Sequence, residues 1–172
     1  MSQRPTPDEY APFYETYVRL VPEGDILATL EAQLDDTLFL LHSVAEEDSL
    51  VRHAPYTWST REVVGHMTDA ERIFGYRALR FARGDATPLP GFDEGAYAKV
   101  AEFDRVLLSS LAAEFEAARR SNILLFKNQG DEAWARGGEA NGSYVTVRAL
   151  AFIIVGHARH HTAILRKRFS RP

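Results

Sequence analysis

Apolar side chains recur every three or four residues along most of this chain, which is the period of a helix with one buried face. Four stretches show the pattern, and almost no part of the sequence alternates as a half-buried strand does. The first stretch begins after Pro22, and proline suits the first position of a helix. Its apolar positions are Leu27, Leu30, Leu34, Leu38 and Leu41. The pattern predicts an amphipathic helix here.

The second and third stretches have the same period. The second begins at Trp58, where Ser59 and Glu62 have the spacing of a capping box, and it ends at Gly84. The third runs from about residue 103 to residue 127. The side chains predicted on its inner face are Leu107, Leu111, Phe115, Ala118 and Leu125.

The fourth stretch begins near Ser143 or Tyr144 and continues to Phe169. Each predicted helix is about 22 to 26 residues long, or roughly 35 Å. Helices of matched length that each carry one apolar face form a bundle. The sequence therefore predicts an all-α fold, a four-helix bundle.

Two of the connections between these helices are long. Residues 84–102 would span ~60 Å in extended form, which is enough to cross the whole bundle. The second and third helices are therefore free to run parallel. Residues 128–142 are rich in glycine, and we expect a flexible loop before the last helix.

The first 21 residues precede the helical pattern and are dense in aromatic side chains. Aromatic residues at this density usually pack against something. We expect residues 1–21 to form an extension that packs on the bundle or on a partner chain, and residues 1–172 to form a single domain. The aromatic residues are Tyr10, Phe13, Tyr14 and Tyr17.

The composition excludes several classes of protein. The chain has 172 residues and no cysteine, which rules out disulfide scaffolds, thiolate metal sites and a cysteine nucleophile. Its net charge of −4 argues against a nucleic-acid-binding surface. No stretch approaches the roughly 18 to 20 apolar residues that cross a bilayer, and we expect no secretory signal, because residues 1–5 lead into aromatic and charged residues without an apolar segment. We therefore expect a cytoplasmic protein with no nucleic-acid or membrane partner.

Histidines interrupt the apolar face of the last predicted helix. His157 and His161 are four residues apart, so both imidazoles lie on one face, one turn apart. This is the spacing with which a helix supplies two nitrogen ligands to one metal ion. His66 lies at the inner edge of the second helix and is a third candidate. Three imidazoles would leave a coordination position open, as in catalytic zinc sites.

Other readings of these residues remain open. His66 taken alone is more often a hydrogen-bonded core or boundary residue than a ligand, and a pair of histidines four residues apart is also common by chance. His160 is a further ligand, a second-layer residue or a surface residue. Asp69, one turn beyond His66, is a candidate catalytic proton acceptor or an orienter of an imidazole, although a solvated carboxylate is the simpler interpretation. Glu71 has the same interpretations as Asp69, with less reason to face the site. Weaker candidates for substrate contacts are Tyr76, Arg77 and Arg80.

Three segments resemble the DinB/YfiT-like superfamily of damage-inducible proteins. They are Trp58–Glu71 (WSTREVVGHMTDAE), Val155–His161 (VGHARHH) and Tyr17–Asp25 (YVRLVPEGD). The resemblance implies a four-helix bundle with up-down-down-up topology and a long crossover between helices two and three. It also implies a divalent metal ion, zinc or nickel, on His66, His157 and His161, and a homodimer.

Members of this superfamily include transferases and isomerases that use bacillithiol, mycothiol or glutathione, and others described as metal-dependent hydrolases. The hypothesis that follows is a metal-dependent transferase that adds a low-molecular-weight thiol to an electrophilic substrate. The alternatives are a hydrolase that activates water and a non-catalytic stress-response bundle with a structural metal. Because the chain has no cysteine, the sulfur of any thiol chemistry must come with the substrate.

Overall fold

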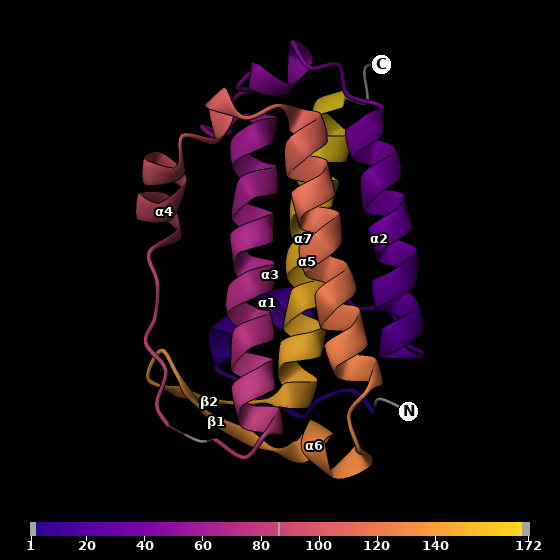
Figure 1. The fold of residues 1–172 in the computed structure, drawn as a ribbon, viewed down its shortest axis with the longest axis vertical. Helices are drawn as coiled ribbons and strands as arrows, with labels where there is room; N and C mark the ends of the chain where they lie inside the picture. The colour runs from indigo at the N-terminus through magenta and orange to yellow at the C-terminus, as the bar shows by residue number, and fades with distance from the viewer. Residues whose placement is uncertain (1–2, 86, 170–172) are drawn as a thin grey trace.

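The computed structural model describes residues 3–85 and 87–169. Within them the chain forms the predicted four-helix bundle, in which α2 and α7 run up and α3 and α5 run down (Figure 1). The up-down-down-up topology is therefore confirmed. No helix in this part of the chain is long and apolar enough to span a bilayer. The bundle helices are α2 (Ile26–His42), α3 (Thr60–Ala82), α5 (Leu108–Lys127) and α7 (Val147–Phe169).

The helix starts follow the local signals in the sequence. Asp25 caps α2 by accepting a hydrogen bond from the Ala28 amide at 3.0 Å. Ser59 and Glu62 form the expected capping box at the start of α3, with the Glu62 carboxylate accepting from the Ser59 amide at 2.8 Å. The apolar faces of the four helices then meet in one continuous core.

The third bundle helix begins at Leu108, five residues later than the sequence predicted. Residues Phe103–Arg105 form a separate 3-10 turn, η4, and Leu107 is 57% exposed at the helix N-cap instead of lying on the inner face. The prediction for Leu107 was wrong because a distant side chain sets this boundary. Glu46 accepts hydrogen bonds from the amides of Leu108 and Ser109, at 2.9 and 3.1 Å, and so caps the helix.

The crossover between α3 and α5 climbs the side of the bundle and contains a helix that the sequence analysis did not predict. This helix, α4, spans Glu94–Ala101 and begins at Asp93, whose carboxylate accepts from the Ala96 amide at 2.9 Å. Figure 1 shows the crossover rising from the end of α3 to the start of α5. The crossover therefore lies beside α3 over the length of the bundle.

The segment expected to be a flexible loop is largely ordered. It contains α6 (Asp131–Ala135) and a hairpin of two antiparallel strands, β1 (Gly137–Ala140) and β2 (Ser143–Thr146). The strands are joined by Asn141 and Gly142, which have φ values of 54° and 73°. Asn-Gly with two positive φ angles is typical of a type I′ hairpin turn. Because β2 takes up residues 143–146, α7 begins at Val147, later than predicted.

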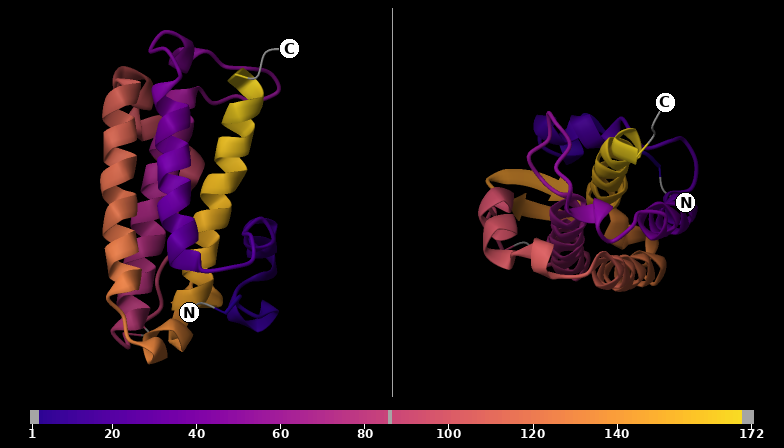
Figure 2. Two further views of the ribbon diagram at one scale, coloured as in Figure 1. Left: turned by 90° about the vertical axis from the view of Figure 1, so that its right-hand side faces the viewer. Right: turned by 90° about the horizontal axis from the view of Figure 1, so that it is seen from above.

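The N-terminal extension packs on the bundle of its own chain. It consists of two 3-10 turns, η1 (Pro7–Glu9) and η2 (Pro12–Tyr14), and the short helix α1 (Glu15–Val18); residues 1 and 2 lie outside the described part of the chain. Glu9 fixes it by accepting hydrogen bonds from Thr146 at 2.7 Å and Arg148 at 2.9 Å. In Figure 2, left, the extension lies beside the lower part of α7.

A glycine in α7 permits this close contact, which gives a testable prediction. A Cβ at Gly156 would lie 2.1 Å from the Tyr17 carbonyl oxygen, so we expect Gly156→Ala to displace α1 and lower stability by about 1–3 kcal/mol. Alanine otherwise stabilises a helix relative to glycine. Gly130→Ala is the control, because no atom lies within 4 Å of its Cβ position. Thermal unfolding of both variants measures the effect. A melting temperature of Gly156→Ala equal to that of the wild-type protein would contradict the close packing of α1 on α7.

Candidate metal centre

Three histidine side chains from two helices converge on one point. His66 extends from α3, and His157 and His161 extend from successive turns of α7. The Nε2 atoms of His66 and His157 are 2.9 Å apart, and one ligand nitrogen from each of the three rings lies within 4.8 Å of the others. The three nitrogen atoms thus lie close enough together to bind a single ion.

Burial favours the neutral form of these rings. It is the main cause that lowers the pKa of His66, and it lowers the pKa of His157 well below its ordinary value. Burial, followed by the neighbouring histidines, lowers the pKa of His161 to about 3. A neutral imidazole has one ring nitrogen with a lone pair that can bind a metal ion, and the Nε2 atoms of His66 and His157, 2.9 Å apart, already lie within hydrogen-bonding distance of each other. The donor set therefore fits a divalent metal ion.

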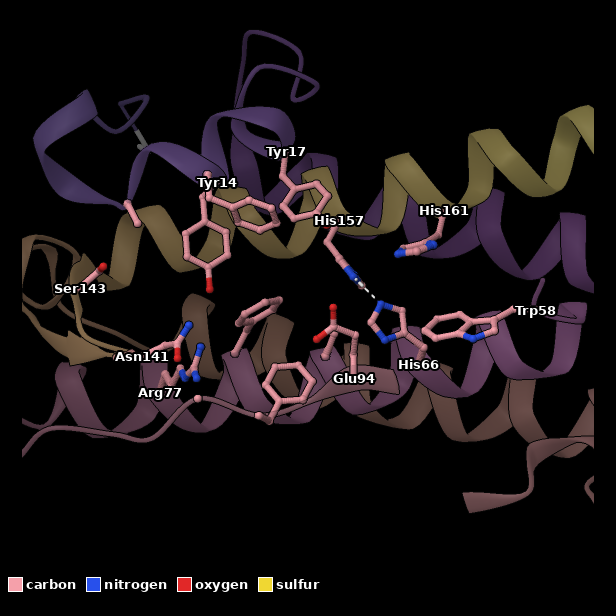
Figure 3. A pocket seen from close by; sticks show the side chains of 17 residues that line it. Tyr14, Tyr17, Trp58, His66, Arg77, Glu94, Asn141, Ser143, His157 and His161 are labelled. Carbon is pink, nitrogen blue, oxygen red and sulfur yellow. Dashed lines mark hydrogen bonds between the residues drawn. The ribbon is translucent and has the colours of Figure 1, made fainter. Parts of the chain in front are cut away.

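The cluster lies at one end of a cavity of about 430 Å³. Its walls come from the N-terminal extension, α3, α7, the crossover and the β1–β2 turn, and many of them are aromatic (Figure 3). Tyr17 and Trp58 contact the histidines directly, with ring centroids 5.3 Å from His157 and 5.1 Å from His66 respectively. The arrangement gives a metal ion an open side that faces a space large enough for a small organic molecule.

Residues 29–165 match the family model of the DinB superfamily. The match covers both helices that carry the histidines. The chain belongs to the DinB superfamily. No curated protein sequence matches it.

Two solved structures show the same fold as this DinB-superfamily protein. YfiT from Bacillus subtilis, described as a probable metal-dependent hydrolase with an unusual four-helix bundle topology, is 17% identical with a TM-score of 0.72, over 99% of this chain and 95% of YfiT. A mycothiol-dependent maleylpyruvate isomerase is 15% identical with a TM-score of 0.69, over 86% of this chain. This chain covers only 62% of the isomerase. At these identities the likeness concerns the fold.

The other residues predicted from the sequence fall in different places. Asp69 is half-buried, lies 3.8 Å from Arg72, and is not among the described residues that line the cavity. Burial raises the pKa of Asp69. His160 is exposed, outside the group of three, and contacts the rings of Tyr17 and His161.

Glu71 points into the bundle core rather than into the cavity. Its carboxylate accepts hydrogen bonds from Arg119 at 2.6 and 3.0 Å and from Asn122 at 2.8 Å. Arg119 also donates to Gln33 at 2.8 Å. Gln33 in turn donates to the carbonyl oxygen of Val155, two residues before His157, at 2.9 Å. This buried network joins all four bundle helices next to the turn of α7 that precedes His157.

Of the three predicted substrate contacts further along α3, only Arg77 lines the cavity. Arg80 pairs with Asp85 and with the hydroxyl of Tyr76, and Tyr76 is 51% exposed. The sequence analysis missed the cavity residues Glu94 and Asn141, because both come from segments between the bundle helices. The Asn-Gly pair at 141–142 was the available signal for the turn that places Asn141. No comparable signal marks Glu94.

Proposed function

We propose that this protein is a metal-dependent enzyme that transfers a low-molecular-weight thiol to an electrophilic carbon, with His66, His157 and His161 as the ligands of the ion. One observation carries the proposal: three imidazoles converge at the end of a cavity of about 430 Å³. Structural metal sites are usually closed by four protein ligands, whereas a three-histidine set leaves a position for substrate. The mycothiol dependence of one structural neighbour supports a thiol as the first substrate.

The ion we propose is zinc or nickel, since imidazole is a good ligand for both. When bound, it would lower the pKa of the thiol and so supply a thiolate nucleophile at neutral pH. The rings of Tyr17, Trp58 and Phe74 pack against the histidines, with centroids 5.3 Å from His157, 5.1 Å from His66 and 6.0 Å from His157 respectively, and give this end of the cavity an apolar wall. The sulfur then forms a bond to the electrophilic carbon, and a leaving group departs or a double bond takes up the electron pair.

Two carboxylates are candidates to receive the thiol proton. Glu94 lines the cavity, and its negative charge acts on His66 and Tyr17, which places its carboxylate near the histidines (Figure 3). Asp69 is one helical turn from His66 but outside the cavity lining. We therefore assign the proton to an Oε atom of Glu94, with Asp69 as the second candidate. Glu94→Gln should lower turnover more than Asp69→Asn.

Hydrolysis is the second candidate function. A carboxylate beside an open metal position is also the arrangement that activates water, and Glu94 would then act as the base. The description of YfiT as a probable metal-dependent hydrolase agrees with this alternative. A homodimer, as the family resemblance implies, is part of the proposal and is tested by light scattering.

The decisive experiment loads metal-free protein with zinc or nickel and measures two reactions. We expect conjugation of monochlorobimane or chlorodinitrobenzene with bacillithiol, mycothiol or glutathione, well above the rate of metal-free protein. A panel of esters and amides is measured in parallel. Activity on the esters or amides, with no thiol conjugation, would favour the hydrolase function and contradict the transferase function. Unfolding on metal removal, with no activity in either assay, would indicate a structural metal.

A further inference from the structure

Arg77 is a buried cation at the far end of the cavity from the histidines. It is 3% exposed and lines the cavity. Arg77 and His66 are eleven residues apart on α3, which places them on one face of the helix about 16 Å apart along its axis. Figure 3 shows the Arg77 side chain in the cavity, away from the three histidines.

Among the described residues, the other two buried arginines each pair with a carboxylate. Arg61 lies 2.8 Å from Glu46, and Arg119 lies 2.6 Å from Glu71. Arg77 has no carboxylate within 4.0 Å in the part of the chain that the structure describes, 3–85 and 87–169. A buried charge is costly unless it is paired. Arg77 is thus the buried arginine to which the described part of the chain supplies no counter-ion.

The contacts that Arg77 does make hold it in place without neutralising it. One terminal nitrogen donates to the Pro90 carbonyl oxygen at 2.9 Å, and the guanidinium lies 5.8 Å from the centroid of the Phe74 ring. A guanidinium carries five N–H donors in a fixed plane. Donors remain for a ligand, and the contacts with Pro90 and Phe74 reduce the entropy lost when it binds.

Neutral polar groups surround the same end of the cavity. Asn141 and Ser143, on either side of the hairpin turn, line it together with Arg77. The backbone N–H of Asn141 donates to the Leu89 carbonyl oxygen at 2.9 Å. The side-chain oxygen of Asn141 lies 2.1 Å from the position that a Cβ on Gly91 would take. The segment 89–91 therefore contacts both Asn141 and Arg77. Amide and hydroxyl donors beside one arginine are suited to an anionic group.

We propose that this end of the cavity is a carboxylate-binding subsite, and that the substrate of the histidine cluster carries a carboxylate that pairs with Arg77. The second half of this statement rests on the proposed function. Arg77 is the one lysine or arginine among the described cavity-lining residues, and the carboxylate of Glu94 lies toward the histidine end, so the Arg77 end can pair with a single negative charge. A phosphate dianion usually recruits more positive charge or a helix N-terminus. The aromatic walls between the two ends suit an apolar linker.

The test titrates metal-free and zinc-loaded protein with octanoate and with octanamide by calorimetry. Octanoate has the charged group and an apolar tail, and octanamide differs only in the loss of the charge. We expect octanoate to bind about 10- to 100-fold more tightly than octanamide, and Arg77→Gln to abolish the difference. Arg80→Gln is the matched control, because Arg80 lies one turn along α3 and outside the cavity lining. Arg80→Gln should keep the full preference.

A second variant guards against a folding defect. Arg77→Lys keeps the charge but not the planar fork, and we expect it to retain part of the preference for octanoate. Equal octanoate affinity in Arg77→Gln and Arg80→Gln would overturn the proposal, as would equal binding of octanoate and octanamide to the wild-type protein. The metal-free titration does not depend on catalysis. The subsite can therefore stand if the transferase assay fails, and can fail if that assay succeeds.

Discussion

Replacing His157 by alanine is expected to abolish stable metal binding. His157 is the most deeply placed of the three histidines, and its Nε2 atom lies 2.9 Å from that of His66. If a site of this kind binds zinc with about 12 kcal/mol shared over three ligands, losing one costs about 4 kcal/mol, or roughly 10³-fold in affinity. Elemental analysis after dialysis should show about one ion per chain in the wild-type protein and almost none in His157→Ala.

His160→Ala is the control for this experiment. His160 is on the same helix and in the same motif, but it is exposed and outside the group of three. The His160→Ala variant should retain the metal content and the metal affinity of the wild-type protein. Equal metal content in His157→Ala and His160→Ala would disprove the proposed ligand set. Circular dichroism of both variants, with and without zinc, separates a loss of metal from a loss of fold.

The largest loss of stability is expected from Arg119→Met. Arg119 is fully buried and donates three hydrogen bonds, two to Glu71 and one to Gln33. Methionine would leave the Glu71 carboxylate buried without its counter-ion, which typically costs 3–5 kcal/mol. For a chain of this length that corresponds to a fall of roughly 10 °C in the melting temperature. Thermal and urea unfolding measure it directly.

Two comparisons identify the cause of this effect. Arg120→Met removes the neighbouring arginine, which is exposed and pairs with Glu116 at 2.7 Å, and should change the unfolding free energy by less than about 1 kcal/mol. The double variant Glu71→Leu/Arg119→Met removes both charges and should recover most of the loss. If the double variant were as unstable as Arg119→Met alone, lost packing rather than an unpaired charge would explain the result.

The bundle was predictable because its signals are local. Ser59 and Glu62 mark the start of α3 through contacts within one turn, and the period of the leucines in α2 follows from one buried face. The start of α5 was mispredicted because the cap of Leu108 comes from Glu46, 62 residues earlier. A periodicity argument has no access to such a contact. The hairpin is a different case, because its Asn-Gly turn was visible in the sequence and was read as a flexible loop.

In the candidate site, too, the residues on the bundle helices were predictable and those on the connections were not. The pairing of His157 and His161 follows from helical spacing, and His66 was added because it lies at the inner edge of the second helix; the structure brings these three rings together. Their role as ligands stays a prediction until metal is measured. The opposite wall could not be deduced, because Glu94 and Asn141 enter the cavity from connections whose paths depend on the completed bundle. Arg77 was a weak candidate because an arginine on a helix usually reaches solvent.

The contact of the N-terminal extension with α7 has a consequence for how the protein folds. Glu9 binds Thr146 and Arg148, which are 137 and 139 residues later in the sequence. During synthesis the extension is made early, but its binding surface is completed only after α7. Proteins rich in contacts of such long range fold slowly, because large loops must close before the contacts form. The cavity wall that contains Tyr14 and Tyr17 therefore depends on contacts that span most of the sequence, and the cavity is complete only once the residues up to Arg148 have been synthesised.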